Sequence, residues 1–365
     1  MLLGVDTGGT FTDFVLLDDS RLRIHKVLST PDAPEQAILQ GIDELGIGAV
    51  AAAGQLVVIH GSTVATNAAL EGKGVRTVFI TNRGFADMLS IGRQARSELY
   101  QLQPALTAPP VPADLCLETG GRMTPGGDEL VPLGRADLES LRAQIEALQP
   151  EAVAINLLYA FVDDRYERAI EASLPAGLFC SRSSEVLPEH GEYERGIATW
   201  LNASLGPLMA SYLQRLQQAL APGPVTIMQS SGGTIALEQA ARRAVNLLLS
   251  GPAGGLAAAR HIGHLCGQPR LMSFDMGGTS TDVALIDGEI RLSNEGHIGR
   301  WPVAVPMVDM HTIGAGGGSL AFVDGANLLH VGPQSAGASP GPACYGLGGT
   351  QATVTDATGT RQFNL

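Results

Sequence analysis

The sequence predicts an α/β protein built from two lobes. Apolar segments of strand length alternate with amphipathic segments of helix length along most of the chain, a pattern typical of α/β lobes. A Gly-rich signature that runs from Asp6 to Asp13 is repeated almost unchanged from Asp275 to Asp282. The chain has 365 residues, enough for two or three domains with their own cores. We therefore expect one copy of the signature in each lobe.

The first lobe is expected to open with three consecutive strands, followed by an amphipathic helix. These elements cover residues 2–6, 11–18, 22–28 and 34–45. Further elements are expected in the order strand 56–59, a helix ending at residue 70, strand 75–80, helix 135–148, strand 152–157 and helix 163–173. Residues 90–135 are rich in Pro, Gly and polar residues, so we expect little regular structure there.

The longest helical pattern covers residues 192–221, and Pro207 predicts a kink in it. We expect this helix to join the lobes, with a first lobe at 1–190, the connecting helix at 191–222 and a second lobe at 223–365. The second lobe is expected to contain strand 225–228, a turn at 250–255 that leads into a helix ending at 264, and strand 270–274. Apolar strands at 319–323 and 327–331 interrupt the Gly-rich tail, so we expect that tail to form an ordered surface that faces a ligand.

Each Gly-rich signature is a short apolar strand, a tight turn and a second apolar strand, an arrangement that suits phosphate binding. Glycines let backbone N–H groups approach an anion closely, and threonines add hydroxyl donors. The residues expected to bind phosphate are Gly8, Gly9, Thr10, Thr12, Gly277, Gly278 and Thr279. A single Gly-Gly turn is often only a turn. Two matching copies predict two hairpins that close on one nucleotide from opposite sides.

The aspartates that begin and end each signature have different expected roles. Asp6 and Asp275 are expected to hold Mg²⁺ through water, because a divalent cation can bridge anionic phosphates and an acidic protein. Turn capping is the alternative explanation for both. Asp13 and Asp282 are candidates to orient a water molecule or a threonine hydroxyl, and turn capping explains them equally well.

Several other polar residues are candidates for a substrate site. His60 ends an apolar strand, where it could polarise a carbonyl or transfer a proton, although a histidine there is more often structural. Thr63 and Asn67 either bind substrate or cap a helix. Arg93 either neutralises a developing negative charge or is a surface cation. Glu189 either serves the site or compensates a helix dipole.

Composition limits the classes of partner. The net charge of −13 argues against a nucleic-acid groove, and no apolar stretch is long enough for a membrane span. The N-terminus lacks a basic region, and the four cysteines are far apart, so we expect a cytoplasmic protein with reduced thiols. Asp309 and His311 alternate on one strand and could share a metal ion, but two ligands are few for a metal site. A homo-oligomer is left open.

Seven segments of the sequence resemble the hydantoinase A / 5-oxoprolinase family, a resemblance that extends over residues 2–356. These segments are residues 6–13, 60–67, 189–195, 250–255, 275–282, 309–319 and 341–346. The resemblance implies the two-lobed, ribonuclease H-like ATPase fold of actin, Hsp70 and sugar kinases, with ATP and Mg²⁺ between the lobes. It also implies that Gly251, Gly254 and Gly255 belong to a loop that contacts adenosine, for which an ordinary helix start is the alternative.

The activity that the resemblance implies is the ATP-dependent opening of a cyclic amide or imide, such as 5-oxoproline or hydantoin, by phosphorylation of its carbonyl oxygen. A hydantoinase B-like partner subunit often completes the reaction in the family. Family members look close to twice this length, which leaves open whether the second lobe is complete. Two alternatives remain: the ATP-binding subunit of an acetone- or acetophenone-type carboxylase, and a nucleotide-binding remnant without turnover.

Overall fold

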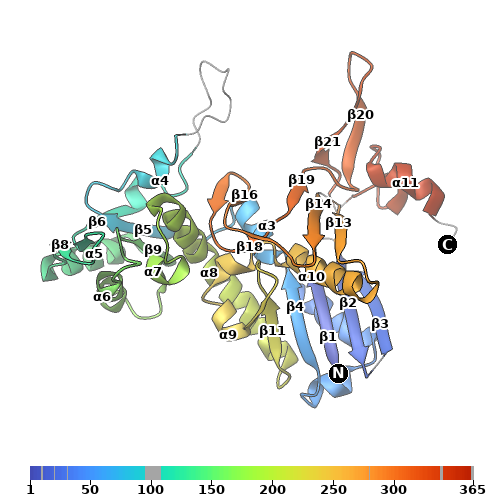
Figure 1. Cartoon of the computed structure of the whole chain (residues 1–365), viewed down its shortest axis with the longest axis horizontal. Coiled ribbons are helices and arrows are strands. Elements are labelled where there is room, and N and C mark those ends of the chain that lie inside the picture. Colours follow the sequence, from blue (N-terminus) through green and yellow to red (C-terminus); the bar gives the residue numbers. More distant parts are fainter. Residues whose placement is uncertain are drawn as a thin grey trace.

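The computed structural model describes residues 1–362 apart from residues 10, 20, 31, 95–107, 279 and 338–339. A six-stranded sheet of order β12-β11-β4-β1-β2-β3 carries the first signature (Figure 1). Its strands are β1 (Leu2–Thr7), β2 (Phe11–Asp18), β3 (Arg21–Leu28), β4 (Val57–Ser62), β11 (Val225–Met228) and β12 (Thr234–Ala236). The first three strands are antiparallel neighbours, whereas β4 and β11 run parallel to β1. The helix α1 (Pro34–Glu44) packs against β2 and β3.

A second, all-parallel sheet of order β10-β9-β5-β6 lies to one side of the first sheet (Figure 1). It consists of β5 (Thr77–Asn82), β6 (Cys116–Thr119), β9 (Ala152–Asn156) and β10 (Phe179–Arg182), with the helices α4 (Met88–Ile91), α5 (Arg135–Leu148), α6 (Arg165–Ser173) and α7 (Ser183–Val186) around it. The expectation of little regular structure over residues 90–135 is wrong in the described part. The four residues of β6 are too few to show a period, and their order comes from pairing with β5.

The helix α8 (Glu192–Leu220) is continuous through Pro207. It contacts β9 and β10 of the parallel sheet as well as α1 and α3 (Val64–Leu70) near the first sheet. Because it is surrounded on so many sides, apolar and small residues occur all around it rather than along one stripe. The predicted helix is therefore confirmed in its bounds, but it joins the two sheets of the first part of the chain.

The helix α10 (Ser250–Leu265) is the element that contacts both signature-bearing sheets. It contacts β4 and β11 on one side and β13 (Arg270–Met276) and β14 (Thr281–Asp287) on the other. β13 and β14 form the second hairpin within a three-stranded sheet completed by β19 (His311–Ile313). The expected boundary at residue 223 does not separate the two sheets, since β11 and β12 pair with the first one.

The remaining elements are short. They are α2 (Gly48–Ala52), β7 (Arg122–Met123), β8 (Glu129–Val131), α9 (Leu237–Ala240), β15 (Leu292–Ser293), β16 (Gly296–Ile298), β17 (Trp301–Val303), β18 (Met307–Val308), β20 (Ser319–Val323), β21 (Leu329–Ser335) and α11 (Val354–Gln362), with 3₁₀ turns at Ala113–Leu115, Ala244–Leu247 and Ala343–Tyr345. The β20–β21 hairpin projects away from the second hairpin sheet (Figure 1). One large core serves the first two sheets, whereas the three-stranded sheet has a small separate core.

Candidate nucleotide site between two hairpins

The two signatures fold into hairpins with the same strand register. In the first hairpin Asp6 pairs with Asp13, and the N–H of Gly8 donates to the carbonyl of Phe11 at 3.0 Å. In the second hairpin Asp275 pairs with Asp282, and the N–H of Gly277 donates to the carbonyl of Ser280 at 2.9 Å. The repeat found in the sequence is therefore also a repeat in the backbone structure. Thr10 and Thr279, the two predicted turn threonines, lie outside the described residues.

The leading aspartates of the two hairpins are close enough to influence each other. Asp6 keeps exposed surface but has protein on several sides, as expected at the wall of a cleft. This partial burial raises the pKa of Asp6, Asp13 and Asp275 raise it further, and Lys26 opposes them. Carboxylates that share a site in this way favour binding of a cation, and Mg²⁺ needs one or two carboxylates when phosphates supply the other oxygens. The residues present therefore fit the predicted Mg²⁺.

The trailing aspartates have different partners in the two hairpins. Asp13 forms an ion pair with Lys26 of β3, with 2.6 Å between Nζ and Oδ1. Asp282 accepts a hydrogen bond from the hydroxyl of Thr312 in β19 at 2.7 Å. Burial raises the pKa of Asp282, the Thr312 hydrogen bond lowers it and Asp275 raises it. Lys26 and Thr312 were not predicted, although Lys26 and Asp13 are equally far from the β2–β3 turn, a spacing that could have identified the pair.

The turn of the first hairpin is held by hydroxyl groups. Ser29 donates to the carbonyl of Gly8 at 2.8 Å, and its Oγ lies 3.0 Å from the hydroxyl oxygen of Thr12. Thr12 is fully buried, so its hydroxyl supports the turn from inside and does not face a ligand. Thr63 donates to the carbonyl of Thr7 at 3.1 Å, which fixes the start of α3 beside the turn.

The turn of the second hairpin is held by a Gly-rich loop. The N–H groups of Gly317 and Gly318 donate to the carbonyls of Gly277 and Gly278 at 2.8 and 2.7 Å. A Cβ on Gly316 would lie 2.5 Å from the carbonyl oxygen of Gly277 and 2.7 Å from the amide nitrogen of Ser280. Only glycine fits at this close backbone approach. The expectation that this part of the tail is ordered is confirmed, and its order comes from packing on the hairpin.

Residues 250–255 form the first turns of α10 and are not a separate loop. The hydroxyl of Ser250 donates to the carbonyl of Ser62 at 3.0 Å, and Leu249 before it has a left-handed backbone, with φ of 57°. A Cβ on Gly251 would lie 3.1 Å from Oδ1 of Asp6. The N-terminus of α10 therefore lies at the first hairpin, and its positive end favours an anionic group there.

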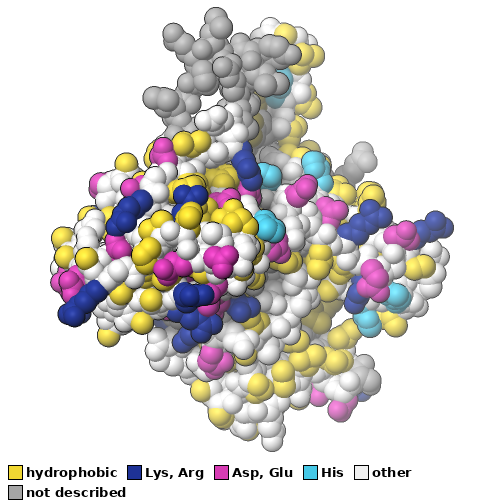
Figure 2. Space-filling model, turned by 60° about the vertical axis from the view of Figure 1, so that its left-hand side comes forward, with side chains coloured by type: hydrophobic (Ala, Val, Ile, Leu, Met, Phe, Trp, Pro, Cys, Tyr) yellow, Lys and Arg dark blue, Asp and Glu magenta, His cyan; other side chains and the backbone are white. Residues whose placement is uncertain are grey.

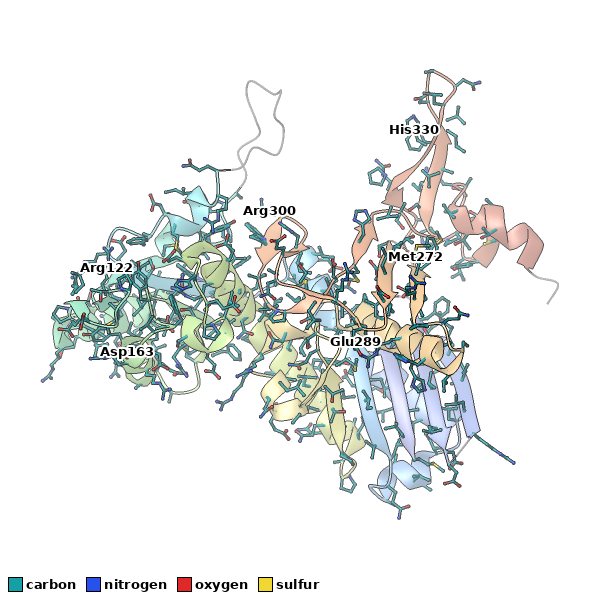
Figure 3. All side chains as sticks on the ribbon, in the orientation of Figure 1. Arg122, Asp163, Met272, Glu289, Arg300 and His330 are labelled. Atoms are coloured by element: carbon teal, nitrogen blue, oxygen red, sulfur yellow. The ribbon has the colours of Figure 1, made fainter. Side chains whose placement is uncertain are left out.

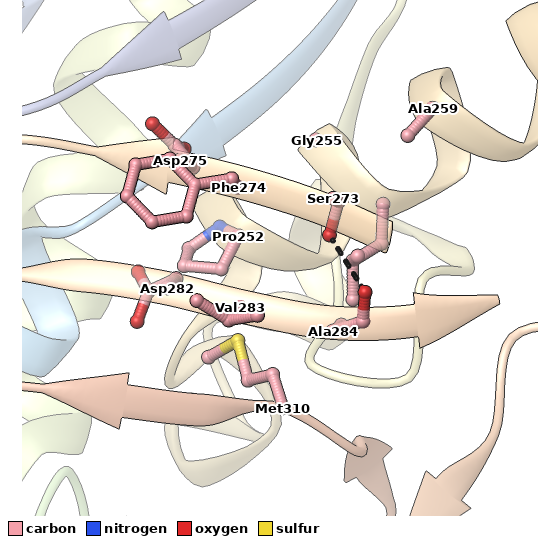
Figure 4. Close-up of a pocket in the computed structure, with 11 residues that line it drawn as sticks. Pro252, Gly255, Ala259, Ser273, Phe274, Asp275, Asp282, Val283, Ala284 and Met310 are labelled. Carbon is pink, nitrogen blue, oxygen red and sulfur yellow. Dashed lines mark hydrogen bonds between the residues drawn. The ribbon is translucent and has the colours of Figure 1, made fainter. Parts of the chain in front are cut away.

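A cavity of about 310 Å³ lies between α10 and the second hairpin. Gly255 and Pro252 of α10 form one wall, and Asp275 and Asp282 lie on the hairpin side (Figure 4). Phe274 and Met310 make part of the lining apolar (Figure 4). Of the predicted adenosine residues, Gly255 lines this cavity and Gly251 lies beside Asp6, whereas a Cβ on Gly254 would point toward Met228.

His60 does not lie at the cleft, so the structure contradicts its predicted catalytic role. Its side chain is fully buried, with Nε2 2.6 Å from the hydroxyl oxygen of Tyr212 in α8. Burial lowers the pKa of His60 to about 4. The structure agrees with the structural alternative given for His60, and its partner Tyr212 could not be identified from the sequence because α8 is distant along the chain.

The four predicted substrate residues separate into two groups. Asn67 lies beside Gly9 of the first turn and donates to Thr63 at 3.4 Å, so these two remain near the cleft. Arg93 instead forms two hydrogen bonds with the carboxylate of Glu194, at 2.7 and 2.6 Å, at the start of α8. Glu189 is exposed close to the same helix start, and its carbonyl accepts from Arg195. The helix α4, which ends two residues before Arg93, lies on the parallel-sheet side of the molecule, away from the hairpins (Figure 1).

The predicted metal pair Asp309 and His311 gains no third ligand. Among the described residues no group of three or more His, Cys, Asp or Glu side chains could hold a metal ion. Asp309 precedes β19 and is not part of it, so the expected alternation on one strand is wrong. No helix in the described part of the chain is long and apolar enough to cross a membrane. Basic and acidic side chains are interspersed on the face shown in Figure 2.

Family models for the hydantoinase/oxoprolinase N-terminal region and for hydantoinase/oxoprolinase match residues 2–176 and 195–360. The caprolactamase subunit alpha of Pseudomonas jessenii is 35% identical over an alignment of 374 positions, which covers 97% of this chain and 53% of that protein. A solved structure of the ATP-dependent caprolactamase from Pseudomonas jessenii has a TM-score of 0.81 at 34% identity, covering 99% of this chain and 54% of the other. Nucleotide-free acetone carboxylase also has a TM-score of 0.81, at 26% identity, covering 97% and 54%. The chain spans about half the length of these relatives.

Proposed function

The chain belongs to the hydantoinase/oxoprolinase family, and we propose that it is the nucleotide-binding part of an ATP-dependent hydrolase that opens cyclic amides or imides. The observation that carries the proposal is the pair of hairpins with one register, whose leading aspartates influence each other beside the N-terminus of α10. One nucleotide bound between the hairpins would contact both. The two-lobed α/β fold of the family agrees with this arrangement.

The roles of the residues follow from their positions. The N–H groups of Gly8 and Gly277 close the two turns through Phe11 and Ser280, so the phosphate donors would be the N–H groups that follow them, at Gly9 and Gly278. Asp6 and Asp275 would hold Mg²⁺, which would supply neutralisation of the phosphate charge. Asn67 lies beside the first turn, where it can orient a phosphate oxygen or the substrate amide.

The proposed reaction begins with transfer of the γ-phosphoryl group to the carbonyl oxygen of the ring amide, with ADP as leaving group. Water then adds to the activated carbon, the ring C–N bond breaks and the nitrogen takes up a proton. A second water hydrolyses the remaining acyl phosphate and releases inorganic phosphate. A site that mainly positions and neutralises charge suits the first step, since phosphoryl transfer requires little covalent chemistry from the protein.

Ketone carboxylation is the second candidate function, because the acetone carboxylase structure matches this chain as well as the caprolactamase structure does by TM-score. It would use the same ATP site with a ketone and bicarbonate. For both functions we propose a partner subunit of the hydantoinase B type. The relative named as a caprolactamase subunit alpha implies a complex of subunits.

The test is calorimetric titration of the chain with Mg·ADP and Mg·ATP, followed by measurement of phosphate release with 5-oxoproline, hydantoin, ε-caprolactam and acetone. Nucleotide binding with release stimulated by a ring amide supports the hydrolase. Release that requires acetone and bicarbonate supports the carboxylase. Absence of nucleotide binding, alone and with a partner subunit, overturns the nucleotide site.

A further inference from the structure

One face of the first sheet carries polar groups of the candidate site at one end and a bare apolar surface at the other. The strand register places Asp13, Val15 and Leu17 of β2 directly opposite Lys26, Ile24 and Leu22 of β3. Because side chains alternate along a strand, all six point to one side of the sheet. Asp6 on β1 pairs with Asp13 and therefore shares that side.

The apolar end of this face, which we call the β2–β3 patch (Val15, Leu17, Leu22 and Ile24), has no covering layer among the described residues. Ile24 is 80% exposed and Leu22 is 68% exposed. On the opposite face Phe14 and Leu16 of β2 are fully covered near α1, and Val27 of β3 is buried. The helix α10 packs mainly on the neighbouring strands β4 and β11 of this sheet and reaches β1 at Gly251, beside Asp6. In Figure 1 the ends of β1–β3 that lie farther from α10 have no helix in front of them.

Antiparallel strands such as β1–β3 can leave one face in water, but that face then normally carries polar residues. An exposed apolar patch on such a face marks an interaction site. The relatives indicate what covers it. The caprolactamase and acetone carboxylase structures share this fold with a TM-score of 0.81, yet 54% of each chain is matched. The rest of each relative is polypeptide that this chain does not contain.

We propose that the β2–β3 patch is the docking site for a polypeptide that corresponds to the unmatched half of these relatives, whether joined to this chain or supplied as a separate subunit. The docked polypeptide has an apolar helix or strand face for Leu22 and Ile24. Since the patch continues into Asp6, Asp13 and Lys26, docking also builds a wall of the phosphate end of the cleft. This proposal concerns assembly and is independent of the reaction proposed above.

The experiment fuses the unmatched half of the Pseudomonas jessenii caprolactamase subunit alpha to this 365-residue chain, and also supplies that half separately. Hydrogen exchange followed by mass spectrometry reports the protection of residues 13–28, with no nucleotide present. The readout is therefore unaffected if the proposed activity fails. The fused form keeps the two parts at high local concentration, which compensates for imperfect complementarity.

We expect docking to slow exchange in residues 13–28 and to be lost in the double variant Leu22→Glu/Ile24→Glu, which places two charges in the interface. The separate half should bind the variant at least about tenfold more weakly. Both residues are exposed, so the variant should fold. Its circular dichroism spectrum tests whether it does. Leu130→Glu is the matched control, because Leu130 is similarly exposed on β8 near the parallel sheet.

Three results overturn the proposal. The first is a fused chain in which residues 13–28 exchange as fast as in the chain alone. The second is binding of the separate half that Leu22→Glu/Ile24→Glu leaves unchanged. The third is self-association of the chain alone that buries the patch, persists in the fused protein and is abolished by the double variant. This result would assign the patch to a second copy of the chain.

Discussion

The two hairpins share one backbone design, but they are supported in different ways. The first lies between β4 and β3 in a six-stranded sheet that contributes to the large core. The second belongs to a three-stranded sheet with a small core, and a Gly-rich loop holds its turn. Met272 on the second hairpin remains exposed, as Figure 3 illustrates. The comparison teaches that the sequence motif specifies the turn and register, whereas the surroundings decide how firmly each hairpin is held.

Acid should destabilise the sheet that holds the first hairpin, and this is the largest effect we expect. His60 is buried in β4 of the six-stranded sheet that contains the first hairpin, and burial lowers its pKa from 6.5 to about 4. The unfolded chain therefore binds a proton that the folded chain does not, so stability is lost as the pH falls from 6.5 toward 4. The loss should reach about 3 kcal/mol at pH 4.

Urea unfolding at pH 7.5 and pH 4 measures this loss, and His60→Gln should remove most of the pH dependence even if it destabilises the protein at both pH values. The control is His261→Gln, because His261 is exposed on α10. Equal pH dependence in the wild type and His60→Gln would show that His60 is not held neutral.

Removing the leading charge of either hairpin should weaken Mg·ATP binding. We expect Asp6→Asn and Asp275→Asn each to reduce the affinity on the order of 100-fold, equivalent to ~2.7 kcal/mol, because each carboxylate helps to hold the cation. Calorimetry measures both constants. Asp18→Asn and Asp287→Asn, at the far ends of β2 and β14, are matched controls. If only one hairpin responds, the nucleotide does not lie between the two.

The second hairpin should depend on its Gly-rich loop. Gly316→Ala places a Cβ against backbone atoms of the hairpin turn, which have to shift. We expect a loss of about 1–3 kcal/mol in the free energy that opens this hairpin, measured by hydrogen exchange of residues 270–287. Gly314→Ala is the control, since a Cβ there meets nothing within 4 Å. Equal exchange in the two variants would show that the loop does not hold the turn.

Removing the partners of the trailing aspartates, Lys26 and Thr312, should change stability least. The two effects should differ in how they depend on salt. Lys26 and Asp13 are both exposed, so Lys26→Met should cost less than ~1 kcal/mol of stability, and 1 M salt should cancel the effect. Thr312→Val removes a neutral donor, and its effect should not depend on salt. Urea unfolding at both ionic strengths checks this difference, and a salt-independent cost for Lys26→Met would contradict an electrostatic role.

The sequence predicted those elements whose formation depends on local sequence pattern. The first three strands, α1, α5 and both hairpins appear within a few residues of their expected bounds, because apolar alternation and turn glycines act over short distances. It failed where distant chain decides the outcome. β6 is a strand because β5 lies beside it, and His60 is structural because α8 covers it. Asp6 and Asp275 were predicted as a pair, but Lys26 and Thr312 required the sheet register.

The length of α10 gives the two hairpins a mechanical relation. Its N-terminus touches the first hairpin at Gly251, and its body packs on the second hairpin sheet. With its 16 residues, the helix is about 24 Å long at 1.5 Å per residue. A rotation of roughly 10° about Gly251 would therefore swing its far end by about 4 Å. At that far end Gly263 lies against Leu271 at the start of β13, whereas Asp275 shares a cavity with Pro252 and Gly255 close to Gly251. Such a rotation would therefore displace the start of the second hairpin while leaving Asp275 near Asp6.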